Sequence, residues 1–291
     1  MSISALVRLF TAHGRFPRGI VRPVKVAIIG GGAIGTVFAA VLHGAGHDVV
    51  LCARRSPAGG PRVDPLGPVR LPVLTDPAEA RPADWVMVAT KAYDVPGAAG
   101  WLGALVGPHT RVAVLRNGID HAARLRPWLP SGTRVVPALI HLAVQTLSPG
   151  HVDWSFGDTV RVPADATDFA ALFAGTPLRI VPSADFEQAA WRKLLLNLMV
   201  PSDPVIRALA PALLAEAVTT ARAAGIPLPD EAITETIAYA DGASTHHGRP
   251  TEHELIVGAV VRTAAQHGVD VPAARTVLAL MRGMNSPLSL R

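Results

Sequence analysis

The sequence predicts an α/β fold in two parts: an N-terminal Rossmann domain with a doubly wound parallel sheet, and a C-terminal all-helical domain. Three observations predict it. Apolar, β-branched runs alternate with helical patterns in the first part of the chain. A glycine cluster separates the first such run from the first helical pattern. Beyond residue 183 the apolar spacing is helical, and glycines and prolines lie at segment ends.

The length and composition fit two globular domains. The chain has 291 residues, and a domain typically has about 150. Hydrophobic residues make up 49% of the chain and charged residues 17%, which excludes disorder for most of it. We therefore predict a nucleotide-binding domain at residues 25–183 and a helical domain at 184–291, after a basic extension at 1–24 that we expect to be disordered.

The single cysteine and the charge distribution exclude several classes of protein. Cys52 alone can form neither an intramolecular disulfide nor a cysteine zinc cluster, so we expect a reducing, cytoplasmic setting. Residues 1–24 hold four arginines and no acid, and the rest of the chain is nearly neutral. Because only 5% of residues are aromatic, nucleic acid is not an expected partner. Residues 26–47 carry no formal charge, but their glycines favour strand, turn and helix over a membrane span.

The first domain is expected to begin with a strand at 25–29 and, after the glycines, a helix at 33–43. A second strand at 47–53 completes a βαβ unit, because the crossover has the length that such a unit requires. The sequence further predicts buried strands at 85–89, 111–115 and 135–139, and a loop at 56–72, which is rich in proline and glycine.

The helical domain is predicted from its start and stop signals. Pro201 ends the first helix, and Pro211 is a candidate kink in the second. Thr251 and Glu254 form a capping box at the start of the third. The predicted helices cover residues 186–199, 205–224, 251–268 and 273–284.

Gly30, Gly32 and Gly35 satisfy the pattern G-x-G-x-x-G, with the first glycine directly after a strand and the last inside the helix. In this context the glycines permit a tight turn and close backbone approach, while N–H groups at Ala33 and Ile34 face a pyrophosphate. The motif therefore predicts a dinucleotide site. A structural turn or a methyltransferase loop gives the same pattern, so the pattern alone leaves both open.

Arg54 and Arg55 follow the second strand, at the place where an NAD site has an acidic residue for the ribose hydroxyl. Two guanidiniums suit a 2′-phosphate, so NADPH is the predicted cofactor. The absence of an acid at this place also argues against a methyltransferase. In the alternative interpretation, the arginines solvate the end of a strand.

Lysine is scarce in this chain, which makes its lysines informative. Every basic residue except Lys25, Lys91 and Lys193 is an arginine. A buried lysine can lose its proton near neutral pH, whereas an arginine cannot. Lys193 shares a helix face with Asn197. Lys91 follows a strand at the carboxyl end, where α/β sheets bind their ligands.

Two further residues have both a functional and a structural interpretation. Asn117 follows the strand at 111–115 in the same way, but Asn-Gly is also a common tight turn. Glu252 is either a site residue or a first-turn acid that complements the helix dipole. The histidines show no H-E-x-x-H spacing, so we predict no metal.

Together these residues resemble the ketopantoate reductase (2-dehydropantoate 2-reductase) family, over residues 25–285. The resemblance implies that the helical domain is of the 6-phosphogluconate dehydrogenase-like type, with the substrate in the cleft between the two domains. The matching motifs, in the family's order, are Gly30 to Gly35, Ala53-Arg54-Arg55, Thr90-Lys91-Ala92, Asn117-Gly118, Trp191-Arg192-Lys193 with Asn197, and Gly248-Arg249-Pro250-Thr251-Glu252.

The resemblance also implies a role for each matching residue. Lys193 would protonate the ketone oxygen as hydride arrives from the nicotinamide, and Glu252 would orient or charge-pair with that lysine. Asn117 would lie beside the nicotinamide and the reacting carbonyl, Lys91 on the cofactor side, and Asn197 would hydrogen-bond substrate groups. Hydride addition develops negative charge on oxygen, which an adjacent ammonium stabilises and protonates.

Three positions on the substrate side depart from the family's pattern. The family usually has asparagine at the position of Pro201, and asparagine and serine at those of Ile237 and Ala240. The implied activity is NADPH-dependent reduction of a 2-oxo acid or a related, less polar ketone, by a monomer or homodimer. Two alternatives stay open: a paralogue that binds NADPH as a sensor or partner module, and a reductase of another electrophile such as an imine.

Overall fold

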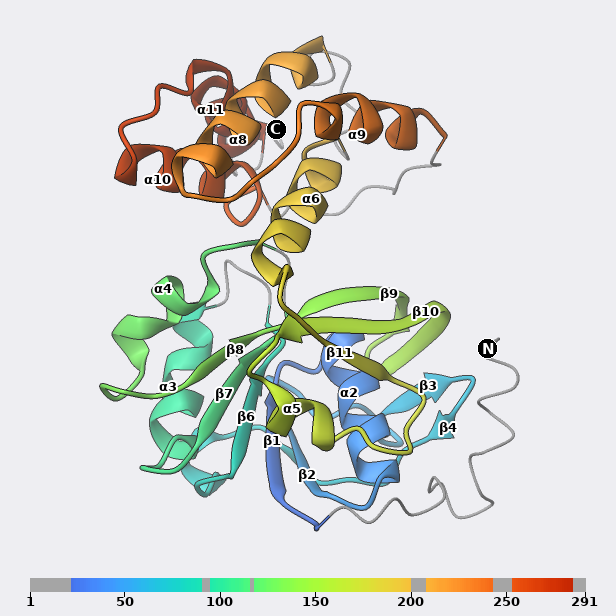
Figure 1. Ribbon diagram of the computed structural model, residues 1–291. Helices are drawn as coiled ribbons and strands as arrows, with labels where there is room; N and C mark the ends of the chain where they lie inside the picture. The colour runs from blue at the N-terminus through green and yellow to red at the C-terminus, as the bar shows by residue number, and fades with distance from the viewer. Residues whose placement is uncertain (1–21, 91–94, 116–117, 200–207, 243–252, 285–291) are drawn as a thin grey trace. The chain divides into compact units, whose positions relative to one another are not determined.

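The computed structural model describes residues 22–90, 95–115, 118–199, 208–242 and 253–284. The chain divides into two compact units (Figure 1). None of the helices within the described ranges is long and apolar enough to cross a membrane. The first unit comprises Met1–Arg116 and His121–Phe186, and the second comprises Asn117–Asp120 and Glu187–Arg291.

The first unit is built on a sheet in which every neighbouring pair of strands is parallel. The chain runs outward from β1 to β5 and then returns to the other side of β1, so the strand order reverses between β1 and β6. This topology confirms the predicted doubly wound parallel sheet. In the spatial order β5-β2-β1-β6-β7-β8, the strands are β5 (Val73–Leu74), β2 (Asp48–Cys52), β1 (Lys25–Ile29), β6 (Trp85–Val88), β7 (Arg111–Val114) and β8 (Val135–Pro137).

This sheet is buried on both faces, which explains the continuous apolar runs of its strands. In β1, Val26 and Ile28 belong to one core cluster, whereas Ala27 and Ile29 belong to another. Each of these four side chains is at most 1% exposed. Buried residues of helix α3 (Val95–Leu105) pack in the second cluster.

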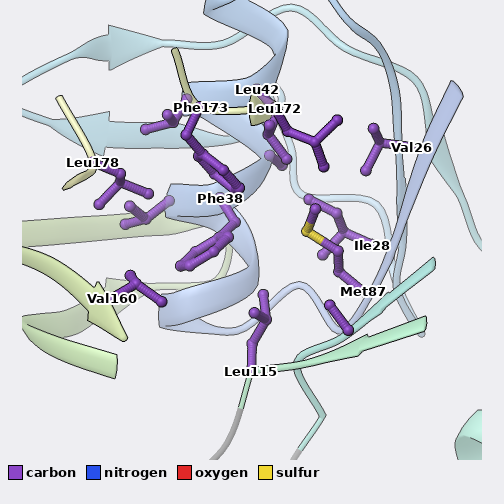
Figure 2. Packing of buried hydrophobic residues seen from close by; sticks show 14 of the residues in the cluster. Val26, Ile28, Phe38, Leu42, Met87, Leu115, Val160, Leu172, Phe173 and Leu178 are labelled. Atoms are coloured by element: carbon purple, nitrogen blue, oxygen red, sulfur yellow. The ribbon is translucent and has the colours of Figure 1, made fainter. Parts of the chain in front are cut away.

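Helix α2 (Ala33–Gly44) lies between the parallel sheet and a second sheet. Phe38 on α2 lies between Ile28 of the parallel sheet and Val160 of the second sheet (Figure 2). Its ring also meets that of Phe173 edge-on, with 5.6 Å between the centroids. A helix enclosed by apolar surfaces on both sides needs apolar residues all round, and the sequence of α2 provides them.

The second sheet is a feature that the sequence patterns did not predict. In it β10 pairs with β3 and β11 in parallel and with β9 in antiparallel. Helix α5 (Thr167–Ala171) follows β10 in the chain. The strands are β3 (Arg62–Asp64), β4 (Gly67–Pro68), β9 (Leu139–Ser148), β10 (His151–Pro163) and β11 (Arg179–Ser183).

Two predictions for the first unit are therefore wrong. The predicted loop at 56–72 contains β3 and β4, and Val63 of β3 is fully buried. A strand this short leaves no period-2 pattern, and its position is set by pairing with β10, far away in the chain. The predicted strand at 135–139 is two strands, because β8 ends at Pro137 and β9 begins at Leu139.

The described part of the second unit consists of helices around one apolar core, as predicted. The carboxylate of Glu216 caps one helix from another. Its two oxygens accept hydrogen bonds of 2.7 Å each from the N–H groups of Ala273 and Ala274. The helices are α6 (Phe186–Leu198), α8 (Ala210–Ala223), α9 (Glu231–Gly242), α10 (Val257–Gln266) and α11 (Pro272–Met284).

The structure corrects the predicted boundaries in this unit. Helix α8 begins at Ala210, so Pro211 lies in its first turn, where proline is tolerated, rather than at a kink. The predicted start of that helix, at 205–207, lies outside the described residues. The sequence patterns did not predict α9.

The predicted capping box is wrong. Helix α10 begins at Val257 with Ile256 as N-cap, and no side chain caps it. Glu254 lies in the preceding turn, where its carboxylate accepts hydrogen bonds from Arg282. A charged partner from another helix therefore replaces the local cap that the sequence pattern predicted. Thr251 lies outside the described residues.

Candidate active site

The glycine turn begins at Gly30, where β1 ends. Its backbone has φ +117°, a conformation that favours glycine. Its N–H donates a hydrogen bond of 2.8 Å to the carbonyl of Cys52 at the end of β2. A Cβ at this position would lie 2.9 Å from the carbonyl carbon of Ala89 and from the nitrogen of Thr90. The turn is therefore held between the ends of β2 and β6, at the point where the strand order reverses.

The other two motif glycines differ in what surrounds them. A Cβ at Gly35 would overlap the carbonyl oxygen of Gly30, so this glycine allows α2 to pack against the turn. A Cβ at Gly32 would meet nothing within 4 Å. Gly32 is also the N-cap of α2. Because glycine has no side chain, no side chain caps this helix, and its first turn holds no acidic residue. Open space before an uncapped helix N-terminus fits the pyrophosphate of a dinucleotide.

Arg54 and Arg55 are exposed, and only Ala53 separates them from the end of β2. Ala53 lies against the turn, since a Cβ at Gly31 would be 3.1 Å from the Ala53 Cβ. Arg54 and Arg55 are therefore the next two residues in the chain after one that lies against the glycine turn. Burial raises the pKa of the Cys52 thiol to about 12, which disfavours the thiolate form.

Thr90, two residues after β6, is a candidate site residue to which the sequence analysis gave no role, although the matching motif Thr90-Lys91-Ala92 includes it. Its hydroxyl oxygen is buried and has no hydrogen-bond partner among the described residues. A buried hydroxyl without a partner is costly, so its position beside Gly30 fits a group that binds there. The sequence signal was its place directly after a buried strand, next to Lys91.

Lys193 and Asn197 lie one turn apart on α6, and both are half-buried. The buried face of the same helix packs into the apolar core through residues that include Trp191 and Leu195. On α6, Arg192 pairs with a carboxylate oxygen of Glu235 at 2.9 Å. The apolar core and this ion pair together set the rotation of α6 about its axis.

Several predicted site residues lie outside the described residues: Lys91, Asn117 and Glu252. Their described neighbours are informative. Gly118 directly follows Asn117 and has φ +113°. Residues 117–120 belong to the second unit, although they follow β7 of the first.

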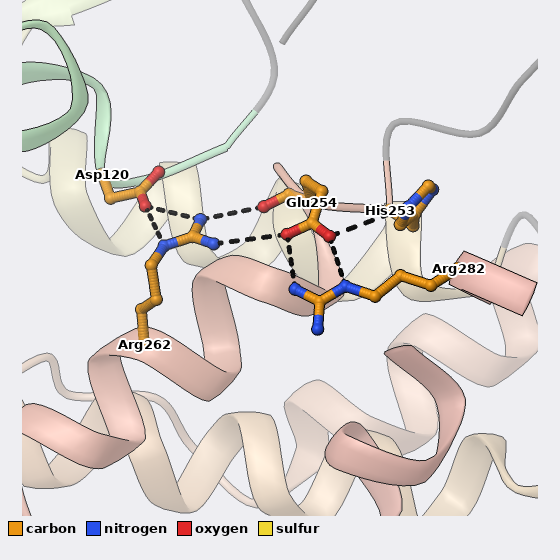
Figure 3. Close-up of polar contacts among 5 residues, drawn as sticks. All are labelled: Asp120, His253, Glu254, Arg262 and Arg282. Atoms are coloured by element: carbon orange, nitrogen blue, oxygen red, sulfur yellow. Dashed lines mark hydrogen bonds and ion pairs between the residues drawn. The ribbon is translucent and has the colours of Figure 1, made fainter. Parts of the chain in front are cut away.

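A network of arginines and carboxylates lies in the second unit (Figure 3). Arg262 of α10 pairs with Asp120, with 2.6 Å between Nη2 and Oδ2. Arg282 of α11 pairs with Glu254 through both carboxylate oxygens, at 2.6 and 3.1 Å. The hydrogen bonds from Arg282 lower the pKa of the Glu254 carboxyl below its ordinary value. No three of the His, Cys, Asp and Glu residues in the described ranges are grouped to hold a metal ion.

Comparison with known proteins shows which family this arrangement resembles. The sequence profile described as "Ketopantoate reductase PanE/ApbA" matches residues 26–166, and the profile described as "Ketopantoate reductase PanE/ApbA C terminal" matches residues 185–285.

Individual relatives match the chain over most of its length. A 2-dehydropantoate 2-reductase of Caulobacter vibrioides is 34% identical over 88% of this chain and 98% of its own. One of Mycobacterium tuberculosis is also 34% identical, over 88% and 96%. The crystal structure of a PanE/ApbA family ketopantoate reductase from Ralstonia eutropha superposes with a TM-score of 0.78 at 27% identity, covering 89% of this chain and 98% of that one.

Proposed function

The chain belongs to the ketopantoate reductase family and is an oxidoreductase, and from this premise we propose that it uses NADPH to reduce a 2-oxo acid to the 2-hydroxy acid. The observation that carries the proposal is the glycine turn at the strand-order reversal, with open space at Gly32 before an uncapped helix. Residues 25–183 would bind the cofactor, and residues 184–291, together with Asn117, would supply the groups that act on the substrate.

The cofactor would bind along the carboxyl edge of the parallel sheet. Backbone N–H groups at Ala33 and Ile34 would face its pyrophosphate, and Arg54 and Arg55 would pair with the 2′-phosphate. The Thr90 hydroxyl would find a partner there, and Lys91, the next residue in the chain, would lie on the cofactor side. When bound, NADPH supplies the hydride that the reaction requires.

The helical unit would supply the proton and the hydrogen bonds. Addition of hydride to the carbonyl carbon places negative charge on the oxygen, and the Lys193 ammonium would stabilise that charge and donate its proton to it. Glu252 would keep this lysine charged and oriented. Asn197 and Asn117 would hydrogen-bond the substrate beside the reacting carbonyl. The products are the hydroxy acid, NADP+ and a neutral lysine, which regains a proton from water.

The substrate side of the site favours a 2-oxo acid with fewer polar groups than ketopantoate. Pro201, Ile237 and Ala240 stand where the family usually has amide or hydroxyl side chains. A buried polar substrate group that lacks a partner costs about 1–3 kcal/mol. We therefore expect kcat/KM to be higher for a 2-oxo acid with an apolar chain than for ketopantoate.

The test follows NADPH absorbance with the full chain across 2-oxo acids that include ketopantoate and apolar analogues. We expect turnover with at least one of them, and loss of turnover in Lys193→Ala with the Kd for NADPH unchanged. Full activity in Lys193→Ala would overturn the assignment of the acid. Tight NADPH binding by the wild-type chain without turnover of any ketone would instead favour a sensor.

A further inference from the structure

Arg262 of α10 joins two segments of the second unit that lie far apart in the sequence (Figure 3). Its Nε donates a hydrogen bond of 2.8 Å to Oδ2 of Asp120, 142 residues away. Its Nη2 lies 2.6 Å from the same oxygen and donates to the backbone carbonyl of Glu254 at 2.8 Å. One guanidinium therefore bridges the segment that precedes helix α4 (His121–Leu125) and the turn that precedes α10.

Each of these two segments carries a residue with a role in the proposed reaction. Asp120 is three residues after Asn117, and Glu254 is two residues after Glu252. We propose that Arg262 is a positioning residue for the proposed reaction, because it ties residues 118–120, which follow Asn117 in the chain, to residues 253–256, which follow Glu252. This inference rests on the proposed function.

The bridge requires the shape of a guanidinium and not only its charge. The planar fork of arginine offers several N–H donors in fixed directions, whereas lysine offers a single point of charge. Arg262 uses Nε and Nη2 on Asp120 while Nη2 also reaches the carbonyl of Glu254. The Asp120 side chain is only 15% exposed, and its other oxygen, Oδ1, is buried without a partner among the described residues. Asp120 thus depends on Arg262 for its position.

Arg282 completes the bridge on the other side of the turn. It fixes the carboxylate of Glu254, while Arg262 holds the backbone of the same residue. Nη1 of Arg262 is also 3.8 Å from Oε2 of Glu254. The turn before α10 is therefore held at both its backbone and its side chain.

Gly258 makes room for this arrangement. A Cβ at Gly258 would lie 2.9 Å from Nη1 of Arg262 and 3.0 Å from Oε2 of Glu254, but 3.6 Å from the nearest backbone atom outside its own helix, the carbonyl oxygen of His253. The crowded atoms are the ends of flexible side chains. Gly258→Ala would therefore displace the bridge without a clash against the backbone.

The first experiment compares Arg262→Lys with the wild-type full chain, using the best 2-oxo acid of the panel. We expect kcat to fall on the order of 10-fold to 100-fold, as for other small misplacements of reacting groups, with the Kd for NADPH unchanged. Amide hydrogen exchange should rise together at residues 118–120 and 253–258. Arg275→Lys is the matched control, because it alters an exposed pair between Arg275 of α11 and Asp270, which precedes that helix, and it should change neither measurement.

The second experiment uses Gly258→Ala and the double variant Arg262→Lys with Asp120→Asn. Gly258→Ala should lower kcat in the same direction as Arg262→Lys. In the Arg262→Lys background, Asp120→Asn should cause no further fall, because both changes break the same bridge. The inference would be overturned if the falls in kcat of the two single variants multiplied in the double variant. It would also be overturned if a folded Arg262→Lys had unchanged kcat.

The two proposals can fail separately. If the wild-type chain reduces no 2-oxo acid, the proposed function fails, and amide exchange alone decides whether Arg262 ties the two segments together. If the wild-type chain is active and exchange rises in only one segment of Arg262→Lys, the bridge is refuted and the proposed function stands.

Discussion

The N-termini of α2 and α11 differ in what faces them. Both present backbone N–H groups and the positive end of a helix dipole. At α11 the carboxylate of Glu216, from a neighbouring helix, accepts hydrogen bonds from Ala273 and Ala274. At α2 the N-cap is Gly32, which makes no side-chain hydrogen bond and has open space where a Cβ would lie.

The difference shows how one physical feature serves two purposes. A helix N-terminus attracts an anion, and the protein supplies that anion itself at α11. At α2 it supplies space and glycines in place of an anion, and in the proposed function a phosphate of the cofactor takes that position. The following changes test this comparison, in order of their expected effect on the free energy of unfolding.

Gly35→Ala is expected to have the largest effect. Its Cβ would overlap the backbone of Gly30, so α2 must shift, at a cost of about 3 kcal/mol. NADPH binding should weaken with it. Urea unfolding and fluorescence titration measure the two effects. Gly103→Ala in α3 is the control, because a Cβ there meets nothing within 4 Å, and equal stability of both variants would contradict the prediction.

Glu216→Ala should lower the free energy of unfolding by about 2 kcal/mol, because it leaves the N–H groups of Ala273 and Ala274 without their charged partner. Glu216→Gln keeps one acceptor oxygen and should lose less. Neither change should alter NADPH affinity. Thermal unfolding checks whether stability falls from the wild type to Glu216→Gln to Glu216→Ala. An Ala variant as stable as the wild type would show that the cap is not needed.

Glu254→Gln should lower the melting temperature at pH 7 by a smaller amount that depends on pH. The pKa of the Glu254 carboxyl is lowered from 4.5, mainly by hydrogen bonds from Arg282. A carboxyl with a lowered pKa stabilises the folded state fully above its unfolded pKa, and this contribution is lost as the pH falls through the folded value. The wild type and the variant should therefore converge at acidic pH. A difference that persists at pH 2 would argue against an ionic origin.

Gly32→Asp should change stability least and cofactor binding most selectively. A carboxylate at the N-cap adds only a few tenths of a kcal/mol relative to glycine, and the position has room for it. The same carboxylate would occupy and repel the site of the pyrophosphate, so NADPH affinity should fall at least about tenfold, or about 1.4 kcal/mol. Unchanged affinity in titration would place the phosphates elsewhere.

The parallel sheet was predictable because its signals are local. Each of its long strands is a run of apolar residues, and the glycine turn follows β1 directly in the sequence. Gly30 and Gly35 could be assigned to a turn and a helix from spacing alone. What spacing could not tell is that a Cβ at Gly35 would overlap the backbone of Gly30, whereas one at Gly32 would meet nothing.

The errors occur where a partner is distant in the chain. The strand β3 exists because β10 pairs with it, and its own three residues carry no period. Glu254 fitted a local capping box, but the guanidinium of Arg282 binds its carboxylate in the fold. Thr90 could be placed after a strand, but only the structure shows that its hydroxyl is buried without a partner among the described residues.

The sequence by itself determined the α/β class, the helical second part and the glycine turn at the end of β1. These features follow from residues that are close in the chain, because backbone conformation and apolar spacing depend on neighbouring residues. Only the tertiary structure decided which partner each charged side chain meets. Glu216 of α8 binds the N-terminus of α11, Arg282 binds Glu254, and Arg262 bridges Asp120 and Glu254. Such pairs depend on where packing brings distant segments, and no local pattern encodes that distance.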